Sequence, residues 1–186
     1  INNSDFLEKK LEKINNVNDL LDFHFKTYSN PKHVNRDMFK VLLENSFGSS
    51  LNILETGSAA HGTKSSILFA SYVKIFGGRF ETVDINPKIK LYFSFLESSN
   101  IKFHSEDSLK FINDLEDKYI NSLDLVYLDS FDLDLNNPSP SQNHGLNEFL
   151  SLNKNLKKGA LIAIDDTPIR YELFGNSKKN KFDFIP

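Results

Sequence analysis

The stretch that decides the fold is Leu54–Thr63, which reads LETGSAAHGT. It joins a short apolar segment, residues 51–54, to a segment with helical periodicity, residues 63–76. Gly57 and Gly62 bracket the connection, and glycine allows a turn in which the backbone approaches a ligand closely. A glycine-rich turn between a strand and a helix also presents the free N–H groups of the helix N-terminus. Because purely structural turns use the same residues, the stretch is weak evidence taken alone.

On both sides of this turn, short apolar segments alternate with helical ones. This alternation predicts an α/β fold: a Rossmann-like, doubly wound, mostly parallel sheet with helices on both faces. We expect residues 49–186 to form one ligand-binding domain and residues 1–48 to form an N-terminal helical segment that covers the cleft or mediates dimerisation, within a single domain overall. The expected strands are 51–54, 79–84, 101–104, 123–128 and 159–164, and the expected helices include 63–76, 87–99, 108–116 and 146–156, with a polar loop over 129–144.

An acidic residue follows the second predicted strand. Asp84 lies 22 residues after Gly62 and ends the segment Arg79–Asp84. A carboxylate at this place can accept hydrogen bonds from ribose hydroxyls, so the turn and Asp84 together predict nucleoside binding. The alternative is a structural turn and an Asp that caps the helix opened by Pro87.

Four acidic motifs in order make the chain resemble the class I S-adenosylmethionine-dependent methyltransferases. They are Glu55-x-Gly57, Asp84 within VDINP, Glu106-Asp107-Ser108, and Asp129 within YLDS, and the resemblance spans about residues 50–168. The turn is one residue longer than is common in the family and lacks its middle glycine. The resemblance implies that S-adenosylmethionine is held by Glu55, Gly57, Ser58, Gly62, Thr63, Asp84, Ile85, Asp107, Ser108 and Asp129.

Carboxylates also follow the last two predicted strands: Asp129 after one, and Asp165 and Asp166 after the other. Neighbouring parallel strands would bring all three to one cleft, where they repel each other unless a cation lies between them. Hard oxygen ligands of this kind suit Mg²⁺ or Ca²⁺, and Mg²⁺ needs few carboxylates because it keeps waters and binds substrate. The arrangement resembles the metal-dependent small-molecule O-methyltransferases of the macrocin and catechol types, which implies a metal site at Asp129, Asp165 and Asp166. The alternative is that Asp165 and Asp166 cap a following helix.

The catechol enzymes carry a lysine three residues beyond the first metal aspartate, where this chain has Asp132. The catechol mechanism therefore does not transfer, and the run from Asp129 through His144 is closer to the macrocin-type group. Asp129 and His144 are the two candidates for the general base, because both are expected within reach of the cleft. Histidine is the usual base near neutral pH. The expected reaction is metal-assisted O-methylation of a small molecule or sugar hydroxyl.

Composition narrows the classes of function. The chain has 186 residues, a net charge of −3 and no cysteine, which excludes disulfides and thiolate metal sites. We expect a cytoplasmic protein that binds a small-molecule acceptor, with no nucleic-acid or membrane partner, and a homodimer is possible. Because the family fold ends with two further strands, we expect the C-terminal strands to be missing from the given sequence.

Other functions remain open at this point. A catalytically silent cofactor-binding protein would keep the same fold. A nicotinamide-dependent oxidoreductase would normally show Gly-x-Gly-x-x-Gly in the first turn, which this chain lacks. A nucleoside triphosphatase would carry a glycine directly before a lysine in its phosphate-binding loop, whereas here Thr63 separates Gly62 from Lys64. A nucleic-acid amino-methyltransferase would carry an Asn/Asp-Pro-Pro-aromatic motif where this chain has Asp129-Ser130-Phe131-Asp132.

Overall fold

The structure is a computed structural model, and it describes residues 3–58 and 62–166. Helices and strands alternate along most of the chain, after three helices at its start. In order, they are α1 (Asn3–Leu11), α2 (Val17–Thr27), α3 (Arg36–Glu44), β1 (Leu51–Thr56), α4 (Ser65–Phe76), β2 (Gly78–Asp84), α5 (Ile89–Phe93), β3 (Ile101–Ser105), α6 (Ser108–Asp114), α7 (Asp117–Ile120), β4 (Leu125–Leu128), α8 (Ser139–Asn153) and β5 (Leu161–Ile164).

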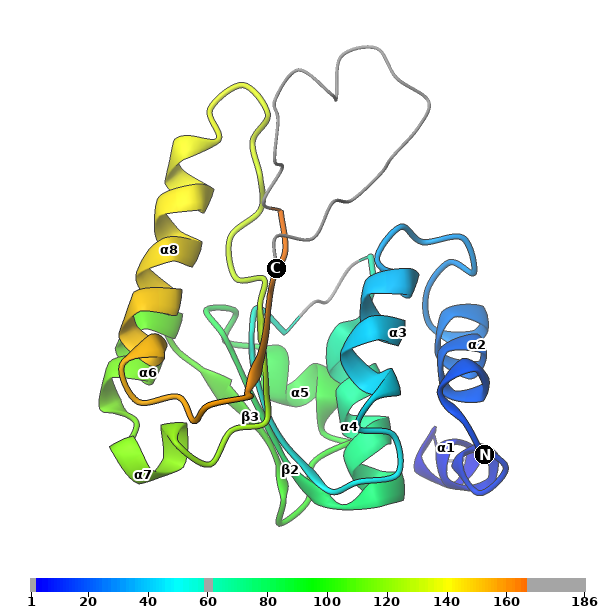
Figure 1. The fold of residues 1–186 in the computed structure, drawn as a ribbon. Helices are drawn as coiled ribbons and strands as arrows, with labels where there is room; N and C mark the ends of the chain where they lie inside the picture. Colours follow the sequence, from blue (N-terminus) through cyan, green and yellow to red (C-terminus); the bar gives the residue numbers. More distant parts are fainter. Residues whose placement is uncertain (1–2, 59–61, 167–186) are drawn as a thin grey trace.

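The five strands form one parallel sheet in the order β3-β2-β1-β4-β5. The chain winds outward from β1 in one direction through β2 and β3, and in the other through β4 and β5. Helices α1 to α5 pack on one face of the sheet and α6 to α8 on the other (Figure 1). The predicted doubly wound α/β fold is confirmed, and its switch point lies between β1 and β4.

The pleat of the strands divides the core in two. Ile53 and Tyr127 point to the face covered by α1 to α5, whereas Leu54, Val126 and Leu128 point to the face covered by α6 to α8. All five side chains are buried. Both faces of the central strands are therefore apolar, as a parallel sheet between two helical layers requires.

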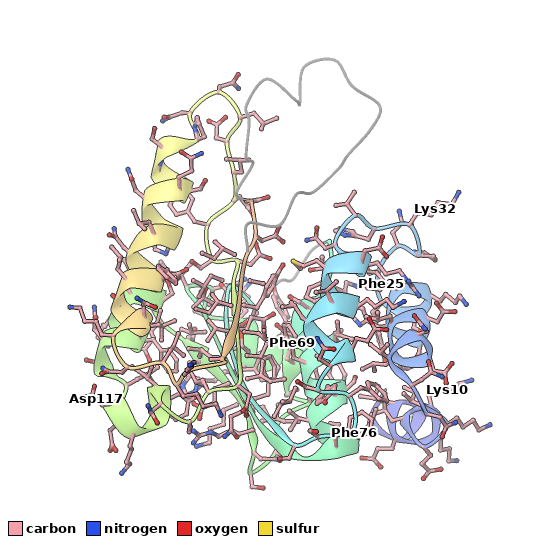
Figure 2. All side chains as sticks on the ribbon, viewed as in Figure 1. Lys10, Phe25, Lys32, Phe69, Phe76 and Asp117 are labelled. Atoms are coloured by element: carbon pink, nitrogen blue, oxygen red, sulfur yellow. The ribbon has the colours of Figure 1, made fainter. Side chains whose placement is uncertain are left out.

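Aromatic side chains join the N-terminal helices to the sheet. Phe39 of α3 packs edge-on against Phe69 of α4 and against Tyr127 of β4, with ring centroids 5.7 and 5.3 Å apart. Phe25 of α2 lies against Phe39 in the same layer. Figure 2 shows Phe25 and Phe69 inside this layer, while Lys10 projects from its outer surface. The N-terminal helices thus share a core with the sheet.

The boundaries of α5 and α8 differ most from those expected. Helix α8 begins at Ser139, with Pro140 in its first turn, so the end of the predicted 129–144 loop is helical; proline suits that position because its fixed φ matches the helix and its missing N–H is not needed. Helix α5 ends at Phe93, well before residue 99. Between α5 and β3, the Ser98 hydroxyl donates to Asn100 Oδ1 in a turn that leads the chain into β3.

Helix α4 shows how helices are buried in this fold. Its first nine residues, Ser65–Val73, are buried between the sheet and the N-terminal helices, yet it is only twelve residues long. Spanning a bilayer takes about 20 residues. In the part of the chain that the structure describes, no helix is long and apolar enough to cross a membrane.

Candidate functional site

The centre of the candidate site is the switch point, where β1 and β4 end side by side. Gly57 follows β1 with a positive φ of 77°, and its N–H donates to the Val83 carbonyl at the end of β2 over 2.8 Å. The Asp129 N–H donates to the Thr56 carbonyl over 3.0 Å. These bonds hold the segments that follow β1, β2 and β4 against one another at the edge where open α/β sheets bind ligands.

Glu55 lies at the end of β1 and is fully buried. The Ser66 hydroxyl donates to its Oε2 atom, whereas its Oε1 atom has no hydrogen-bond partner among the described residues. Burial raises the pKa of Glu55 to about 7. The Ser65 hydroxyl, at the start of α4, is likewise buried without a described partner. The Glu55 carboxylate therefore lies buried among hydroxyl groups at the start of α4.

The predicted turn residues are held from both sides. Ser58 is buried and its hydroxyl is hydrogen-bonded to Thr82 over 2.8 Å. At the other end of the turn, the Gly62 carbonyl accepts from the Ser29 hydroxyl over 2.7 Å. The Thr63 carbonyl lies 2.7 Å from Nε2 of the buried His24 in α2, so the neutral ring carries its proton on Nε2. Residues 59–61, between these anchors, lie outside the described residues.

Asp84 and Ile85 lie at the end of β2, as predicted. Asp84 Oδ1 accepts from the Asn86 N–H over 2.7 Å, and among the described residues its second oxygen has no hydrogen-bond donor. Ile85 is 77% exposed, so it offers an apolar surface beside the carboxylate.

Asp107 and Ser108 follow β3 at the start of α6. Asp107 is the N-cap residue of this helix, and its Oδ1 atom accepts from the Lys110 N–H over 2.9 Å. Ser108 is buried, and its hydroxyl points toward α8 rather than toward β2, because it lies 3.0 Å from His144 Nε2. Asp107 is thus the N-cap of helix α6.

Asp129 and Asp165 lie at the ends of β4 and β5, where the sequence predicts them. The Tyr127 hydroxyl lies 2.5 Å from Asp165 Oδ2 and 3.2 Å from Asp129 Oδ2, so the two carboxylates share one donor. Burial, with repulsion from Asp165, Glu55 and Asp166, raises the pKa of Asp129 to about 8. Burial, together with Asp129, Asp165 and Glu55, raises the pKa of Tyr127 well above its usual value, which keeps it a neutral donor. The raised pKa of Asp129 indicates that the donors of this cluster do not offset the repulsion among its carboxylates.

Asp166 completes the predicted trio. It has a positive φ of 54°, and its Oδ2 atom accepts from the Leu133 N–H over 3.0 Å. Asp129, Asp165 and Asp166 all line one cavity of about 20 Å³, together with His144 and Glu148. That volume has room for a water molecule or an ion. Within residues 3–58 and 62–166, however, no three acidic or histidine side chains converge on one point as metal ligands do.

His144 lies on the first half of α8 and faces the end of β4. Its Nε2 atom is 3.0 Å from the Ser108 hydroxyl and 3.3 Å from Oε1 of Glu148, one helical turn further on. Glu148 is fully buried and accepts from the Ser130 hydroxyl over 2.6 Å and from the Thr56 hydroxyl over 3.1 Å. A buried carboxylate therefore ties α8 to β1 and to the loop after β4, with His144 at its edge.

The sequence-based prediction missed Glu148, Tyr127 and Asn35. The spacing of four residues between His144 and Glu148 places both on one face of a helix. Because His144 was predicted to lie in a loop, this relationship was not recognised from the sequence. Tyr127 falls within the predicted strand 123–128, and the sequence gives it no role in the site. Asn35 donates to Asp165 over 2.6 Å from 130 residues away, and no local pattern in the sequence indicates that contact.

Three solved structures of one enzyme are similar to this chain. They are of the MycE methyltransferase from the mycinamycin biosynthetic pathway: in complex with Mg and SAH in two crystal forms, with TM-scores of 0.59 and 0.58 and identities of 17% and 18%, and with Mg, SAH and mycinamycin VI, with a TM-score of 0.57 and 17% identity. Each match covers 83% of this chain but only 37–38% of the MycE chain. No protein-family model matches the sequence, and a search of curated proteins finds no match either.

The likeness extends over most of this chain and concerns its fold. Over most of its length, this chain is structurally similar to S-adenosylmethionine-dependent methyltransferases and has their Rossmann-like core.

Proposed function

We propose that this chain is an S-adenosylmethionine-dependent methyltransferase that methylates a hydroxyl group of a small molecule, with a divalent metal ion, Mg²⁺ in the first instance, at the carboxylates after β4 and β5. One observation carries the proposal. Asp129, Asp165 and Asp166 line a single cavity at the carboxyl end of a sheet whose fold is that of a methyltransferase crystallised with Mg and SAH.

The cofactor would lie across the ends of β1 and β2. Asp84 has an oxygen available for ribose hydroxyls, and the exposed Ile85 beside it would contact the adenine ring. Gly57 allows the cofactor to approach the backbone. Glu55 lies buried beneath the turn, where a nearby cation such as the sulfonium or the amino group would favour its ionised form. Ser58, Asp107 and Ser108 would contribute mainly through their backbone, because their side chains are already engaged. The carbonyls of Gly62 and Thr63 are engaged, so these residues would contribute through their N–H groups or the Thr63 hydroxyl.

The donor set supports the metal proposal. Asp129, Asp165 and Asp166 supply the oxygen ligands that Mg²⁺ prefers, and Mg²⁺ needs few carboxylates because it keeps waters and binds substrate oxygens. The raised pKa of Asp129, about 8, reflects burial and repulsion that a cation would offset. A bound divalent ion would orient the acceptor hydroxyl and lower its pKa. The carboxylates would have to move closer together than they stand here.

The remaining chemistry falls to residues of this chain. The acceptor oxygen attacks the methyl carbon, the carbon–sulfur bond breaks, and S-adenosylhomocysteine leaves with the electron pair on its sulfur. The hydroxyl proton passes to His144 or to Asp129, both of which line the cavity. Glu148 accepts hydrogen bonds from Thr56 and Ser130, so it fixes the position of α8, and with it His144, against the end of β1 and the loop after β4. Holding the two reactants in line contributes about 7–11 kcal/mol to lowering the barrier.

Calorimetric titration with S-adenosylmethionine and S-adenosylhomocysteine, with and without Mg²⁺, tests the proposal. Asp84→Ala should weaken cofactor binding at least about tenfold, the equivalent of one lost charged hydrogen bond. Asp134→Ala is a matched control, because Asp134 also accepts from the N–H two residues on but lies in the exposed loop after β4. Asp165→Ala should abolish the metal-dependent part of the heat.

Three outcomes separate the alternatives. Binding without turnover, over a panel of hydroxylated acceptors that includes sugars, would indicate a catalytically silent cofactor-binding protein. If the affinity for the two nucleosides is the same with and without Mg²⁺, and Asp165→Ala does not change it, the metal is removed from the proposal. If neither nucleoside binds the folded protein, the methyltransferase proposal is wrong, and nicotinamide cofactors are the next ligands to test.

A further inference from the structure

Two side chains of the N-terminal helical segment hold the end of the glycine-rich turn that leads into α4. The Ser29 hydroxyl, two residues after α2, donates to the Gly62 carbonyl over 2.7 Å. His24, in the last turn of α2, donates from Nε2 to the Thr63 carbonyl over 2.7 Å. These bonds cross 33 and 39 residues of sequence and engage two successive carbonyl groups just before the helix begins. The approach to α4 is therefore fixed from α2.

The direction of these carbonyl groups also sets the direction of the N–H groups that follow them. The described residues contain no cis peptide bond, and in a trans peptide the N–H points opposite to the C=O. Because the carbonyls of Gly62 and Thr63 point to α2, the N–H groups of Thr63 and Lys64 point away from it. Among the described residues, neither N–H has a hydrogen-bond acceptor. Both are therefore available to a ligand at the start of α4, at the edge where open α/β sheets bind ligands.

Lys64 shows that this conformation needs support. Its φ is 50°, in the left-handed region, and as the N-cap of α4 it makes no side-chain capping bond. A residue other than glycine adopts this region at a cost, and only where its surroundings impose it. The carbonyl that His24 holds belongs to the peptide group between Thr63 and Lys64. The bond from His24 thus acts directly at the strained position.

His24 contributes an N–H group at a place where an apolar side chain would be less costly. It is 1% exposed, and its Nδ1 atom is buried with no hydrogen-bond partner among the described residues. A buried unpaired acceptor costs stability, which a leucine would avoid. What leucine lacks is the donor to Thr63. Because Ser29 is only partly buried, we expect His24 to be the stronger of the two anchors.

We propose that His24 and Ser29 are positioning residues for S-adenosylmethionine: they hold residues 62–64 in the conformation that presents two N–H groups to the cofactor. Helix α2 then sets the affinity for the cofactor without touching it. Loss of an anchor lowers the fraction of molecules in the binding conformation, and the apparent affinity falls by the same fraction. The inference rests on the cofactor part of the proposed function and does not involve the metal.

The test measures the order of the turn and the affinity for the cofactor product on the same samples. The heteronuclear ¹H–¹⁵N NOE of Thr63 and Lys64, without ligand, reports their order on the ps–ns timescale. Calorimetric titration with S-adenosylhomocysteine gives the affinity. His24→Leu and Ser29→Ala remove the donors, whereas His24→Gln and Ser29→Thr keep one. Asn16→Ala is the matched control, because it removes the capping bond to Asp19 at the other end of α2.

We expect His24→Leu to bind S-adenosylhomocysteine about tenfold more weakly than the wild type and Ser29→Ala about two- to fivefold, the range of single hydrogen bonds. Both should lower the NOE of Thr63. His24→Gln and Ser29→Thr should stay within about twofold of the wild-type affinity. Asn16→Ala should lower the unfolding midpoint and leave both the NOE and the affinity unchanged. If His24→Leu does not fold, Ser29→Ala carries the test, since its side chain is partly exposed.

The inference is overturned if the folded double variant His24→Leu/Ser29→Ala binds S-adenosylhomocysteine as tightly as the wild type. It is also overturned if Asn16→Ala loses as much affinity as His24→Leu, because α2 would then act only through stability. A lower NOE without a loss of affinity would show order that the cofactor does not use, with the same consequence. If the wild type itself binds no S-adenosylhomocysteine, the cofactor part of the proposed function fails and the inference fails with it.

Discussion

The backbone of Gly57 lies directly against the carbonyl group of Asp129: a Cβ atom at Gly57 would stand 1.9 Å from that oxygen. Since 3.0 Å is already too close for such a contact, the two loops meet only because residue 57 has no side chain. The positive φ of 77° adds a second reason for glycine. The end of the candidate cofactor strand and the start of the acidic cluster are thus packed as one unit.

Gly57→Ala should therefore lower the free energy of unfolding by roughly 3 kcal/mol or more, combining about 1–3 kcal/mol of backbone strain with the displacement of the Asp129 backbone. Gly159→Ala is the control, because Gly159 has a φ of 89° but open space around it, so only strain applies. Urea unfolding measures both variants. Equal losses in the two would mean that the contact with Asp129 does not constrain residue 57.

Tyr127→Phe removes the hydroxyl that Asp129 and Asp165 share and keeps the ring that packs on Phe39. The metal-free variant should lose about 1–3 kcal/mol of unfolding free energy, because buried acceptors lose their donor. If a cation occupies this cluster, millimolar Mg²⁺ should stabilise the variant as well as the wild type. Thermal unfolding with and without Mg²⁺ measures this, with Tyr92→Phe, at an exposed ring, as the control. An unchanged midpoint in Tyr127→Phe would show that the hydroxyl bridge contributes nothing.

Glu148→Gln replaces a fully buried carboxylate that accepts from Thr56 and Ser130. An amide can accept at only one of the two positions, so one hydroxyl loses its acceptor and the variant should be destabilised by about 1–3 kcal/mol. Glu116→Gln, at a side chain that is 68% exposed, should change stability by no more than about 0.5 kcal/mol. Urea unfolding compares the two, and similar values for both would refute a structural role for the Glu148 network.

His24 makes the stability of the protein depend on pH. Burial lowers the pKa of His24 from 6.5 to about 4, against a partly compensating hydrogen bond to the Thr63 carbonyl. Because the folded pKa is lower, the unfolded chain binds more protons between these values. The contribution is therefore fully present above pH 6.5 and is lost as the pH falls toward 4. The loss between pH 7 and pH 5 should be roughly 2 kcal/mol.

The variant His24→Gln isolates this contribution, since glutamine offers an N–H in place of Nε2 but does not titrate. Urea unfolding of both proteins at pH 7 and pH 5 gives the difference directly. The wild type should lose roughly 2 kcal/mol more than His24→Gln over this interval. Parallel losses in the two proteins would mean that His24 is not the group responsible.

Local sequence patterns predicted the strands well, and with them the positions of the acidic residues. Asp84, Asp129 and Asp165 each follow an apolar run, and each lies where its strand ends. Helix boundaries were less predictable. The segment Ser139–His144 is polar and follows a proline-rich stretch, so it was predicted as loop, but packing of Ser141 and Glu148 against the sheet side makes it the start of α8. The error hid the relationship between His144 and Glu148.

By itself, the sequence determined the parallel α/β architecture and the edge of the sheet at which the acidic residues gather, because periodicity and strand ends are local properties. Only the tertiary structure decided which atoms meet there: the Tyr127 hydroxyl between two carboxylates, the Ser108 hydroxyl on His144, and Asn35 on Asp165. Those contacts join residues up to 130 positions apart, and they depend on how the helical layers pack against the sheet, which no short stretch of sequence encodes.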